Sequence, residues 1–273
     1  MVNMNAKYSD ILNEVVKQVP FEPEICIVLG SGLGDFVEKI EIIKSISASS
    51  LPNYPGSTVQ GHQGYIHFSK YEGKKLLVLQ GRIHFYEGYS ISQCVLPVHI
   101  AARLGCKKVL LTNAAGGVNP LFKPGSLMLA SSFNGTIIGK KLADLIGLVT
   151  LEQKNSFLDL PSKEMYDKIR IAALEEKISL CEGLYWMTMG PGYETTAEIN
   201  MYRKYGADAV GMSTVPEAYY ASYLGLKVAA VSCITNFAAG LSSRALSHAD
   251  VMETAVGVKD NFERLVKRSI ELI

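Results

Sequence analysis

The sequence lacks the cysteine patterns that build metal sites or disulfide frameworks. Its five cysteines are odd in number and widely scattered, with no CxxC or Cys/His spacing: Cys26, Cys94, Cys106, Cys181 and Cys233. We therefore expect no zinc site and no disulfide scaffold, and we expect buried, reduced thiols of the kind found in the cytosol.

Long apolar runs and an excess of one charge are missing as well. The longest apolar runs, such as Val228–Val231, are as short as a strand, whereas a membrane-spanning helix needs about 20 apolar residues. The first 20 residues contain Lys7, Asp10, Glu14 and Lys17, so they lack the apolar stretch of a signal peptide. The 27 basic and 26 acidic residues leave a net charge of +1, without the basic excess of a nucleic-acid-binding protein. We expect a cytoplasmic protein with neither membrane nor nucleic acid as partner.

The chain of 273 residues has no linker, repeat or low-complexity tract, which favours one domain over residues 1–273. Hydrophobic residues make up 48%, enough for a large core. Short apolar runs alternate with amphipathic stretches, a pattern typical of an α/β fold. The runs that predict buried strands are Ile25–Leu29, Lys75–Gln80, Lys108–Thr112, Leu127–Ala130, Leu184–Met189, Ala209–Gly211 and Lys227–Ile234.

Three segments predict helices. The first is Asp10–Val19 with Ser9 as N-cap, and the second is Ile91–Leu104, in which Pro97 belongs in the first turn. The third is the C-terminal segment, where apolar residues recur at spacings of 3 and 4. Ser247 and Asp250 resemble a capping box there, which would put His248 in the first turn.

A glycine-rich turn follows the first predicted strand, in the stretch Ile25–Gly34. Gly30 and Gly32 fit the first two positions of a G-x-G-x-x-G dinucleotide fingerprint, but Asp35 occupies the third, and no P-loop lysine follows. The turn suits an anion held by backbone N–H groups and the Ser31 hydroxyl. Glycines that only make a tight turn remain the alternative.

A second candidate anion-binding segment lies between Gly81 and Gly88. If it is extended, Arg82, His84 and Tyr86 project to one side, while Ile83 and Phe85 point into the core. A guanidinium and an imidazole at neighbouring positions suit one oxyanion. A solvated edge strand is the alternative.

The other histidines are less informative. His62 lies in a glycine-flanked loop, where it could bind either a ligand or the backbone, and His67 and His99 fit structural positions in a strand and a helix.

Polar residues gather after several other predicted strands. The small residues of Thr112–Gly117 let backbone donors face a ligand, and Gly211–Glu217 and Ser232–Phe237 each end a strand with polar groups. Tyr193 offers a flat face and Glu194 a carboxylate, a pair that suits stacking on a base and accepting its ring N–H, although Glu194 also fits a helix start. Ligands of open α/β sheets gather beyond strand ends. We therefore expect one pocket that contains Ser31, Arg82, His84, Glu194, Ser213 and Asn236.

These clusters together resemble the trimeric, low-molecular-mass purine nucleoside phosphorylases, of the purine nucleoside phosphorylase and methylthioadenosine phosphorylase family. The resemblance covers most of the chain in order. It implies a single-domain mixed β-sheet flanked by helices, in a homotrimer. The matching stretches are VLGSGLG (Val28–Gly34), GHQG (Gly61–Gly64), QGRIHFYEGY (Gln80–Tyr89), TNAAGG (Thr112–Gly117), GPGYETTAE (Gly190–Glu198), GADAVGMSTVPE (Gly206–Glu217) and ITN (Ile234–Asn236).

The resemblance also implies a role for each matching residue. The phosphate-binding residues would be Ser31, His62, Arg82, His84, Ser213 and the backbone at Ala114. Tyr193, Glu194 and Asn236 would bind the purine, and Tyr86, Met212 and His248 the sugar. Asn236, Glu194 and His84 would be the catalytic residues. Inorganic phosphate would be the co-substrate, with no metal or other cofactor, and it would cleave 6-oxopurine nucleosides to a free base and (deoxy)ribose 1-phosphate, as in purine salvage.

The chain departs from the family in the segment after Gly125. The family's Asp-His pair is missing there, the stretch from Lys140 to Leu160 looks like a shortened loop, and Phe237 stands where some members carry a polar residue. Two alternatives follow: a methylthioadenosine phosphorylase, or a nucleoside-binding homologue without turnover. Ser213 and Asn236 favour 6-oxopurines, because the methylthioadenosine branch typically carries Thr and Asp there.

Overall fold

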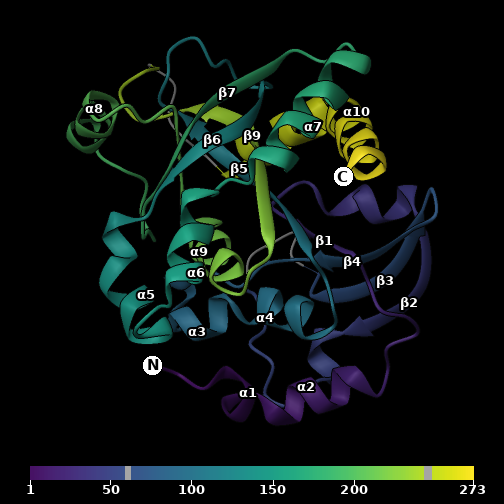
Figure 1. Ribbon diagram of the computed structural model, residues 1–273. Coiled ribbons are helices and arrows are strands. Elements are labelled where there is room, and N and C mark those ends of the chain that lie inside the picture. Colours follow the sequence, from purple (N-terminus) through teal and green to yellow (C-terminus); the bar gives the residue numbers. More distant parts are fainter. Residues whose placement is uncertain (59–62, 243–247) are drawn as a thin grey trace.

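The computed structural model describes residues 1–58, 63–242 and 248–273 and contains one nine-stranded sheet (Figure 1). The order of strands across the sheet is β2-β3-β4-β1-β5-β8-β7-β6-β9, and β9 also pairs with β5. The strands are β1 Ile25–Leu29, β2 Glu41–Ser47, β3 Tyr65–Tyr71, β4 Lys74–Gln80, β5 Lys108–Gly117, β6 Leu127–Asn134, β7 Leu180–Met187, β8 Ala209–Gly211 and β9 Lys227–Phe237.

The sheet is mixed, as expected. Its centre is parallel: β1 pairs with β4 and β5, and β5 pairs with β9 along ten residue pairs. The edge formed by β2, β3 and β4 is antiparallel. All seven predicted strands are present, and β2 and β3 are additional. β2 is mostly exposed, so it lacks the apolar run that identified the others.

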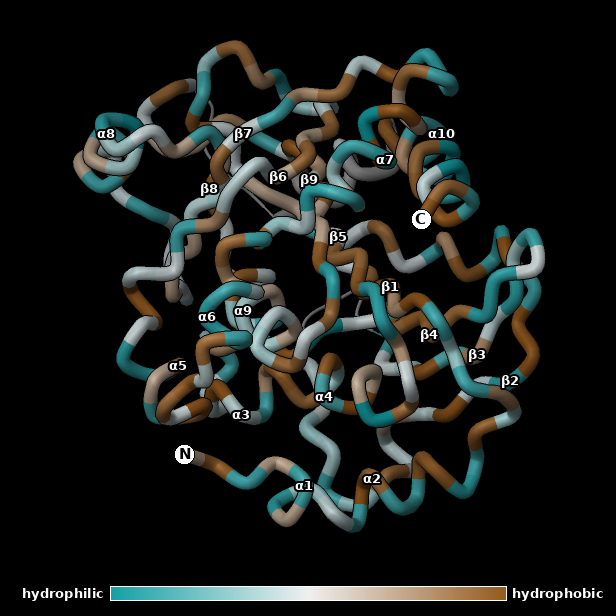
Figure 2. Tube along the Cα trace, in the orientation of Figure 1, coloured by the Kyte–Doolittle hydropathy of each residue, from teal (hydrophilic) through white to brown (hydrophobic). Residues whose placement is uncertain are grey.

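The sheet is buried on both faces. In β1, Cys26 and Val28 face one core, whereas Ile25, Ile27 and Leu29 face the other, so every second residue points to the same side. Near-continuous apolar strands are the result of this double burial. Helix α2 (Ser9–Val16) covers one face of the sheet and α10 (His248–Leu272) the other. Figure 2 shows that the residues of both helices alternate between hydrophobic and hydrophilic within a turn.

Helices cover both faces. The first face is covered by α1 Met4–Lys7, α2 Ser9–Val16, α3 Ile91–Cys94, α4 Leu96–Arg103, α5 Gly139–Ile146 and α9 Val215–Tyr223, with α6 Leu151–Leu158 against α9. The second is covered by α7 Lys163–Glu175 and α10 His248–Leu272, which pack together, and α8 Thr196–Lys204 lies apart at the end of the sheet (Figure 1).

The predicted helix ends need correction. α2 begins at Ser9 itself, with Tyr8 as N-cap, so Ser9 does not cap it. The predicted helix Ile91–Leu104 is two helices, and Pro97 lies in the first turn of the second, where its missing N–H costs nothing. α10 begins at His248, as expected, while the proposed cap Ser247 lies outside the described residues.

Two further segments differ from expectation. Residues 85–87 form a turn of 3-10 helix rather than a strand, so the alternation over 82–86 fails: Ile83 is buried, but Phe85 is only half-buried. Residues 140–160 are not a short loop but contain most of α5 and all of α6. Among the described residues, none of the helices combines the length and apolar character needed to cross a membrane.

Candidate active site

One pocket of about 820 Å³, its open mouth included, lies where the predicted strand ends meet. Its walls come from the turn after β1, the segment after β4, the ends of β5 and β9, the β8–α9 connection and the loop after β7. It contains the predicted residues Ser31, Arg82, His84, Tyr86, Ala114, Tyr193, Glu194, Met212, Ser213 and Asn236. His62 and the side chain of His248 lie outside the described residues.

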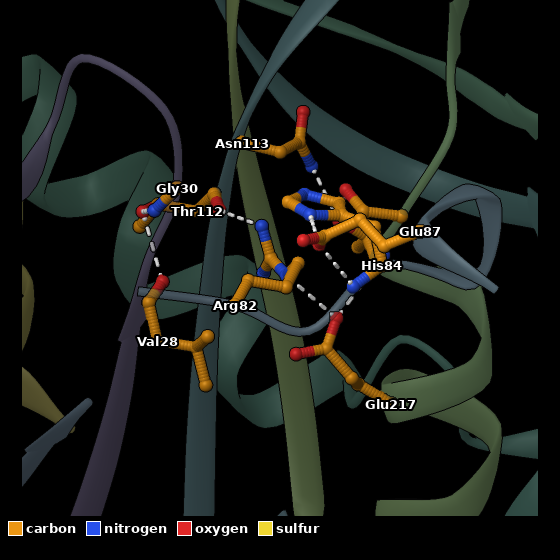
Figure 3. Close-up of polar contacts among 10 residues, drawn as sticks. Val28, Gly30, Arg82, His84, Glu87, Thr112, Asn113 and Glu217 are labelled. Carbon is orange, nitrogen blue, oxygen red and sulfur yellow. Dashed lines mark hydrogen bonds and ion pairs between the residues drawn. The ribbon is translucent and has the colours of Figure 1, made fainter. Parts of the chain in front are cut away.

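Arg82 is held rigidly at the inner end of this pocket. Its side chain is buried, its Nε donates to Glu217 Oε2 at 2.8 Å, and its Nη1 donates to the carbonyl of Thr112 at 3.0 Å (Figure 3). A guanidinium fixed by both a carboxylate and a strand carbonyl has a single orientation. It is therefore a preorganised donor for an anion.

The glycine-rich turn is fastened to the same strand. The N–H of Gly30 donates to Thr112 Oγ1 at 3.2 Å, and that hydroxyl donates to the carbonyl of Val28 at 2.9 Å (Figure 3). A Cβ on Gly30 would lie 2.6 Å from the Thr112 carbonyl oxygen, so only glycine permits this approach. The turn thereby brings Ser31 to the pocket.

Ser213 enters the pocket from a strained turn. Thr214 has φ 72° and ψ −51°, and the N–H of Val215 donates to the carbonyl of Ser213 at 2.7 Å, which makes a γ-turn with positive φ. Thr214 is held by Asn113 Nδ2, which donates to its Oγ1 at 2.9 Å, and by its own N–H, which donates to Glu217 Oε2 at 3.1 Å. Strain that surrounding contacts maintain is common at functional sites.

His84 is paired with Glu87 rather than aligned along a strand. Glu87 Oε1 lies 2.8 Å from His84 Nδ1, and burial, with Arg82 nearby, lowers the pKa of His84 to about 4. Burial alone would raise the pKa of Glu87, but hydrogen bonds from Thr58 and His84 hold it below its usual value. His84 is thus a neutral imidazole that donates from Nδ1 to a carboxylate, so its Nε2 carries no proton.

The other half of the pocket offers groups that suit a flat, polar ring. Tyr193 is half-exposed, and Glu194 Oε1 accepts a hydrogen bond from Thr188 Oγ1 at 2.5 Å. Asn236 Oδ1 accepts from Thr235 Oγ1 at 2.8 Å, and its Nδ2 donates to the carbonyl of Phe237 at 3.0 Å. The amide oxygen has two acceptor positions and the amide nitrogen two N–H donors, and each of these bonds uses one of them. Both amide atoms can therefore still bind a ligand.

Tyr86 and Met212 line the same pocket. The Tyr86 ring stacks on His84 with centroids 4.7 Å apart. A Cβ on Gly190 would lie 2.6 Å from Met212 Sδ and 3.2 Å from Tyr86 Cβ. Gly190, at φ 64°, therefore lets the loop after β7 close against both side chains.

Four supporting residues were not predicted as part of the site. Glu87, Thr188, Glu217 and Thr235 position predicted residues without belonging to that set. Glu87 and Glu217 stand inside matched motifs, three residues after His84 and Thr214, and the latter spacing is that of a capping box. Thr188 carries no signal of this kind, because only the folded loop brings it to Glu194.

Comparison with known proteins places this chain in a defined class. A family model described as the Phosphorylase superfamily matches residues 24–271. The chain therefore belongs to the phosphorylase superfamily.

Its relatives there are purine nucleoside phosphorylases. It is 40% identical over 255 residues to purine nucleoside phosphorylase 1 of Geobacillus stearothermophilus, covering 92% of each chain. It is 33% identical to the mouse purine nucleoside phosphorylase, covering 97% of this chain and 94% of that one. The crystal structure of Schistosoma mansoni purine nucleoside phosphorylase in complex with inosine superposes with a TM-score of 0.87 at 29% identity, over 99% and 98% of the two chains.

Proposed function

We propose that this enzyme cleaves the N-glycosidic bond of 6-oxopurine nucleosides, such as inosine and guanosine, with inorganic phosphate as the second substrate and no metal or other cofactor. The products are the free purine and ribose or deoxyribose 1-phosphate. One observation carries the proposal: a single pocket joins a fixed guanidinium, Arg82, to two groups that can read a purine edge, Glu194 and Asn236.

Phosphate binds at the inner end of the pocket. Arg82 supplies the charge, Ser31 and Ser213 supply hydroxyl groups, and the backbone at Ala114 adds a donor. His84 accepts from the remaining P–OH of the phosphate dianion, because its Nδ1 proton is committed to Glu87. The anion is thereby oriented with unprotonated oxygens toward the sugar.

The sugar lies between the phosphate and the base, against Tyr86 and Met212. As the C–N bond breaks, the sugar gains positive charge, and a phosphate oxygen forms the new bond to the anomeric carbon. Positioning of the two substrates and electrostatic complementarity account for the acceleration.

The departing purine gains negative charge, and Asn236 stabilises it by donating to O6. When N7 takes up a proton from solvent water, the Asn236 carbonyl accepts from N7–H, while Glu194 accepts from N1–H and fixes the base edge, and Tyr193 packs on the ring. A 6-aminopurine such as adenine matches neither contact, because it has no N1 proton and carries a hydrogen-bond donor at position 6. We therefore propose a preference for 6-oxopurines.

A substrate assay tests this proposal. Purified enzyme is incubated with inosine, guanosine, adenosine or methylthioadenosine, with and without phosphate. Cleavage of inosine and guanosine only with phosphate is expected. Equal product in phosphate-free buffer would indicate a hydrolase. A preference for methylthioadenosine would indicate the methylthioadenosine phosphorylase branch of the family. Binding of nucleoside without formation of product would indicate a nucleoside-binding protein.

Arg82→Ala separates the anion site from the base site. The variant is expected to raise the phosphate KM by at least tenfold with a smaller change in the inosine KM, since a charge-assisted contact contributes about 1.5–3 kcal/mol. Unchanged phosphate kinetics would refute the assignment of Arg82.

We also propose a cytoplasmic homotrimer. Large apolar side chains are exposed at Leu148, Leu151 and Leu158, on and beside α6, and an apolar cavity lined by Phe133, Phe157 and other side chains lies near that helix. Apolar surface concentrated in this way is typical of protein interfaces. Light scattering of the active enzyme is expected to give three times the chain mass of 29.8 kDa, and an active monomer would contradict the trimer.

A further inference from the structure

Thr188 stands beside the carboxylate that reads the base. Its Oγ1 donates to Glu194 Oε1 at 2.5 Å, and its side chain is nearly fully buried. The residue directly follows β7, and its N–H donates to the carbonyl of Gly211, the last residue of β8, at 2.8 Å. Thr188 is therefore attached to the sheet, whereas Glu194 lies on the loop before α8.

This hydrogen bond joins a rigid element to a less rigid one. A carboxylate on a loop can rotate about its own bonds, and the anchored hydroxyl removes part of that freedom. The carboxylate has about four acceptor positions, of which Thr188 uses one, so the others stay available to a ligand.

We propose that Thr188 is a positioning residue that determines how well the site uses purines with a 2-amino group relative to purines without one. The proposal rests on the function proposed above. It concerns only the ratio between two accepted substrates.

The two purines require different things of Glu194. Hypoxanthine offers N1–H alone, and one carboxylate oxygen can follow that donor through a range of rotations. Guanine offers N1–H and a 2-amino N–H side by side, so both oxygens must face the ring edge at once. A carboxylate held at one oxygen by Thr188 meets this requirement, and a freely rotating one loses the second contact for part of the time.

Two variants isolate the hydroxyl. Thr188→Val keeps the shape and removes the donor, and Thr188→Ser keeps the donor. Steady-state kcat/KM is measured for guanosine and inosine at saturating phosphate, and the phosphate KM is measured at saturating inosine. Turnover of both nucleosides by the wild-type enzyme is measured before the variants. Absence of wild-type turnover would contradict the proposed function and not this inference.

For Thr188→Val we expect kcat/KM for guanosine to fall by about 10- to 100-fold, the effect of one charge-assisted hydrogen bond. The kcat/KM for inosine should fall by a clearly smaller factor, and the phosphate KM should stay unchanged. Thr188→Ser should restore the guanosine-to-inosine ratio.

Calorimetric binding of free guanine and hypoxanthine provides a readout that needs no turnover. The Thr188→Val substitution should weaken the binding of guanine more than the binding of hypoxanthine. Equal losses of affinity for both bases, or an unchanged guanosine-to-inosine ratio of kcat/KM, would overturn the proposal. If Thr188→Val does not fold, the same comparison between Thr188→Ser and Thr188→Ala decides it, with the ratio retained only in the serine variant.

Discussion

Arg82 and Glu217 form an ion pair that is buried on both sides: Nε and Oε2 are 2.8 Å apart, and the side chains are 2% and 3% exposed. The two residues are 135 positions apart, and the pair joins the segment after β4 to the first turn of α9. Burial raises the pKa of the Glu217 carboxyl, and the guanidinium opposes this by favouring the carboxylate. In the free enzyme the carboxylate therefore compensates the cation that is to meet phosphate.

Glu217→Gln tests this compensation. The variant leaves a buried guanidinium without its carboxylate, so we expect stability in phosphate-free buffer to fall by about 3 kcal/mol. A bound phosphate dianion replaces part of the missing charge. Phosphate should therefore raise the melting temperature of the variant more than that of the wild type.

Glu176→Gln is the matched control, because Glu176 and Arg264 form a partly exposed pair. It should change stability by less than about 1 kcal/mol and leave the phosphate effect unaltered. Thermal unfolding over a phosphate titration measures both quantities. Parallel phosphate shifts in Glu217→Gln and wild type would contradict the charge argument.

Gly30→Ala should damage the anion site through packing. The added Cβ would lie 2.6 Å from the Thr112 carbonyl oxygen, 2.7 Å from Asn113 Cα and 3.2 Å from Arg82 Nη1. Because two of these atoms belong to the backbone of β5, we expect a loss of about 1–3 kcal/mol and a raised phosphate KM.

Gly257→Ala makes the same chemical change on the exposed side of α10, where no atom lies within 4 Å of the new Cβ. It should not lower stability, because alanine is favoured over glycine in a helix, and it should leave phosphate kinetics unchanged. Urea unfolding and phosphate titration of both variants provide the comparison, and equal behaviour would show that the close approach at Gly30 does not matter.

The acid stability of the fold should depend on His99. Its ring lies 3.0 Å from the Tyr220 hydroxyl and 3.1 Å from Asn5 Oδ1, and burial, with Arg103 nearby, lowers its pKa to about 4. The unfolded chain takes up a proton near pH 6.5 and the native chain only near pH 4, so stability falls as the pH drops through this window.

His99→Gln removes that titration. The variant should be less stable at pH 7.5, but from pH 7.5 to 5 it should lose about 2 kcal/mol less than the wild type. Part of the slope should remain, because burial also lowers the pKa of His84 and His67. Urea unfolding at pH 7.5, 6 and 5 measures the slopes, and identical slopes would contradict the role of His99.

A feature of this structure could be predicted from the sequence when the interactions that form it are local in the chain. Strands buried on both faces, such as β1 and β9, are predictable because their apolar runs record the burial directly. The edge strand β2 and the 3-10 turn after His84 are not, since β2 carries little apolar signal and the turn is stabilised by Glu87 and Thr58.

The same distinction holds in the pocket. Ser31, Arg82 and Asn236 could be predicted because each stands in a recognisable motif, the first two just after a strand and the third near the end of β9. Their supports could not, because contacts such as Asn113 with Thr214 join positions 101 residues apart. Predicting that a residue lines a pocket therefore needs only local pattern, whereas predicting what orients it needs the register of the whole sheet.

The choice of base should depend on a single atom of Asn236. Its Oδ1 accepts from Thr235 at 2.8 Å and its Nδ2 donates to the carbonyl of Phe237 at 3.0 Å, which fixes the donor and acceptor ends of the amide. Asn236→Asp replaces the donor with an acceptor. The carboxylate can then receive the 6-amino group of adenine, and it repels the O6 of hypoxanthine.

We expect kcat/KM for inosine to fall by at least 100-fold in Asn236→Asp, because the leaving purine loses a hydrogen bond and gains a repulsion. The kcat/KM for adenosine should fall far less or rise, so the inosine-to-adenosine ratio of kcat/KM should decrease by about 100-fold. Asn261→Asp, the same change on the exposed face of α10, should leave the ratio at its wild-type value. Phosphorolysis rates for both nucleosides decide the question: a proportional loss on inosine and adenosine would mean that Asn236 supports the pocket without reading the base.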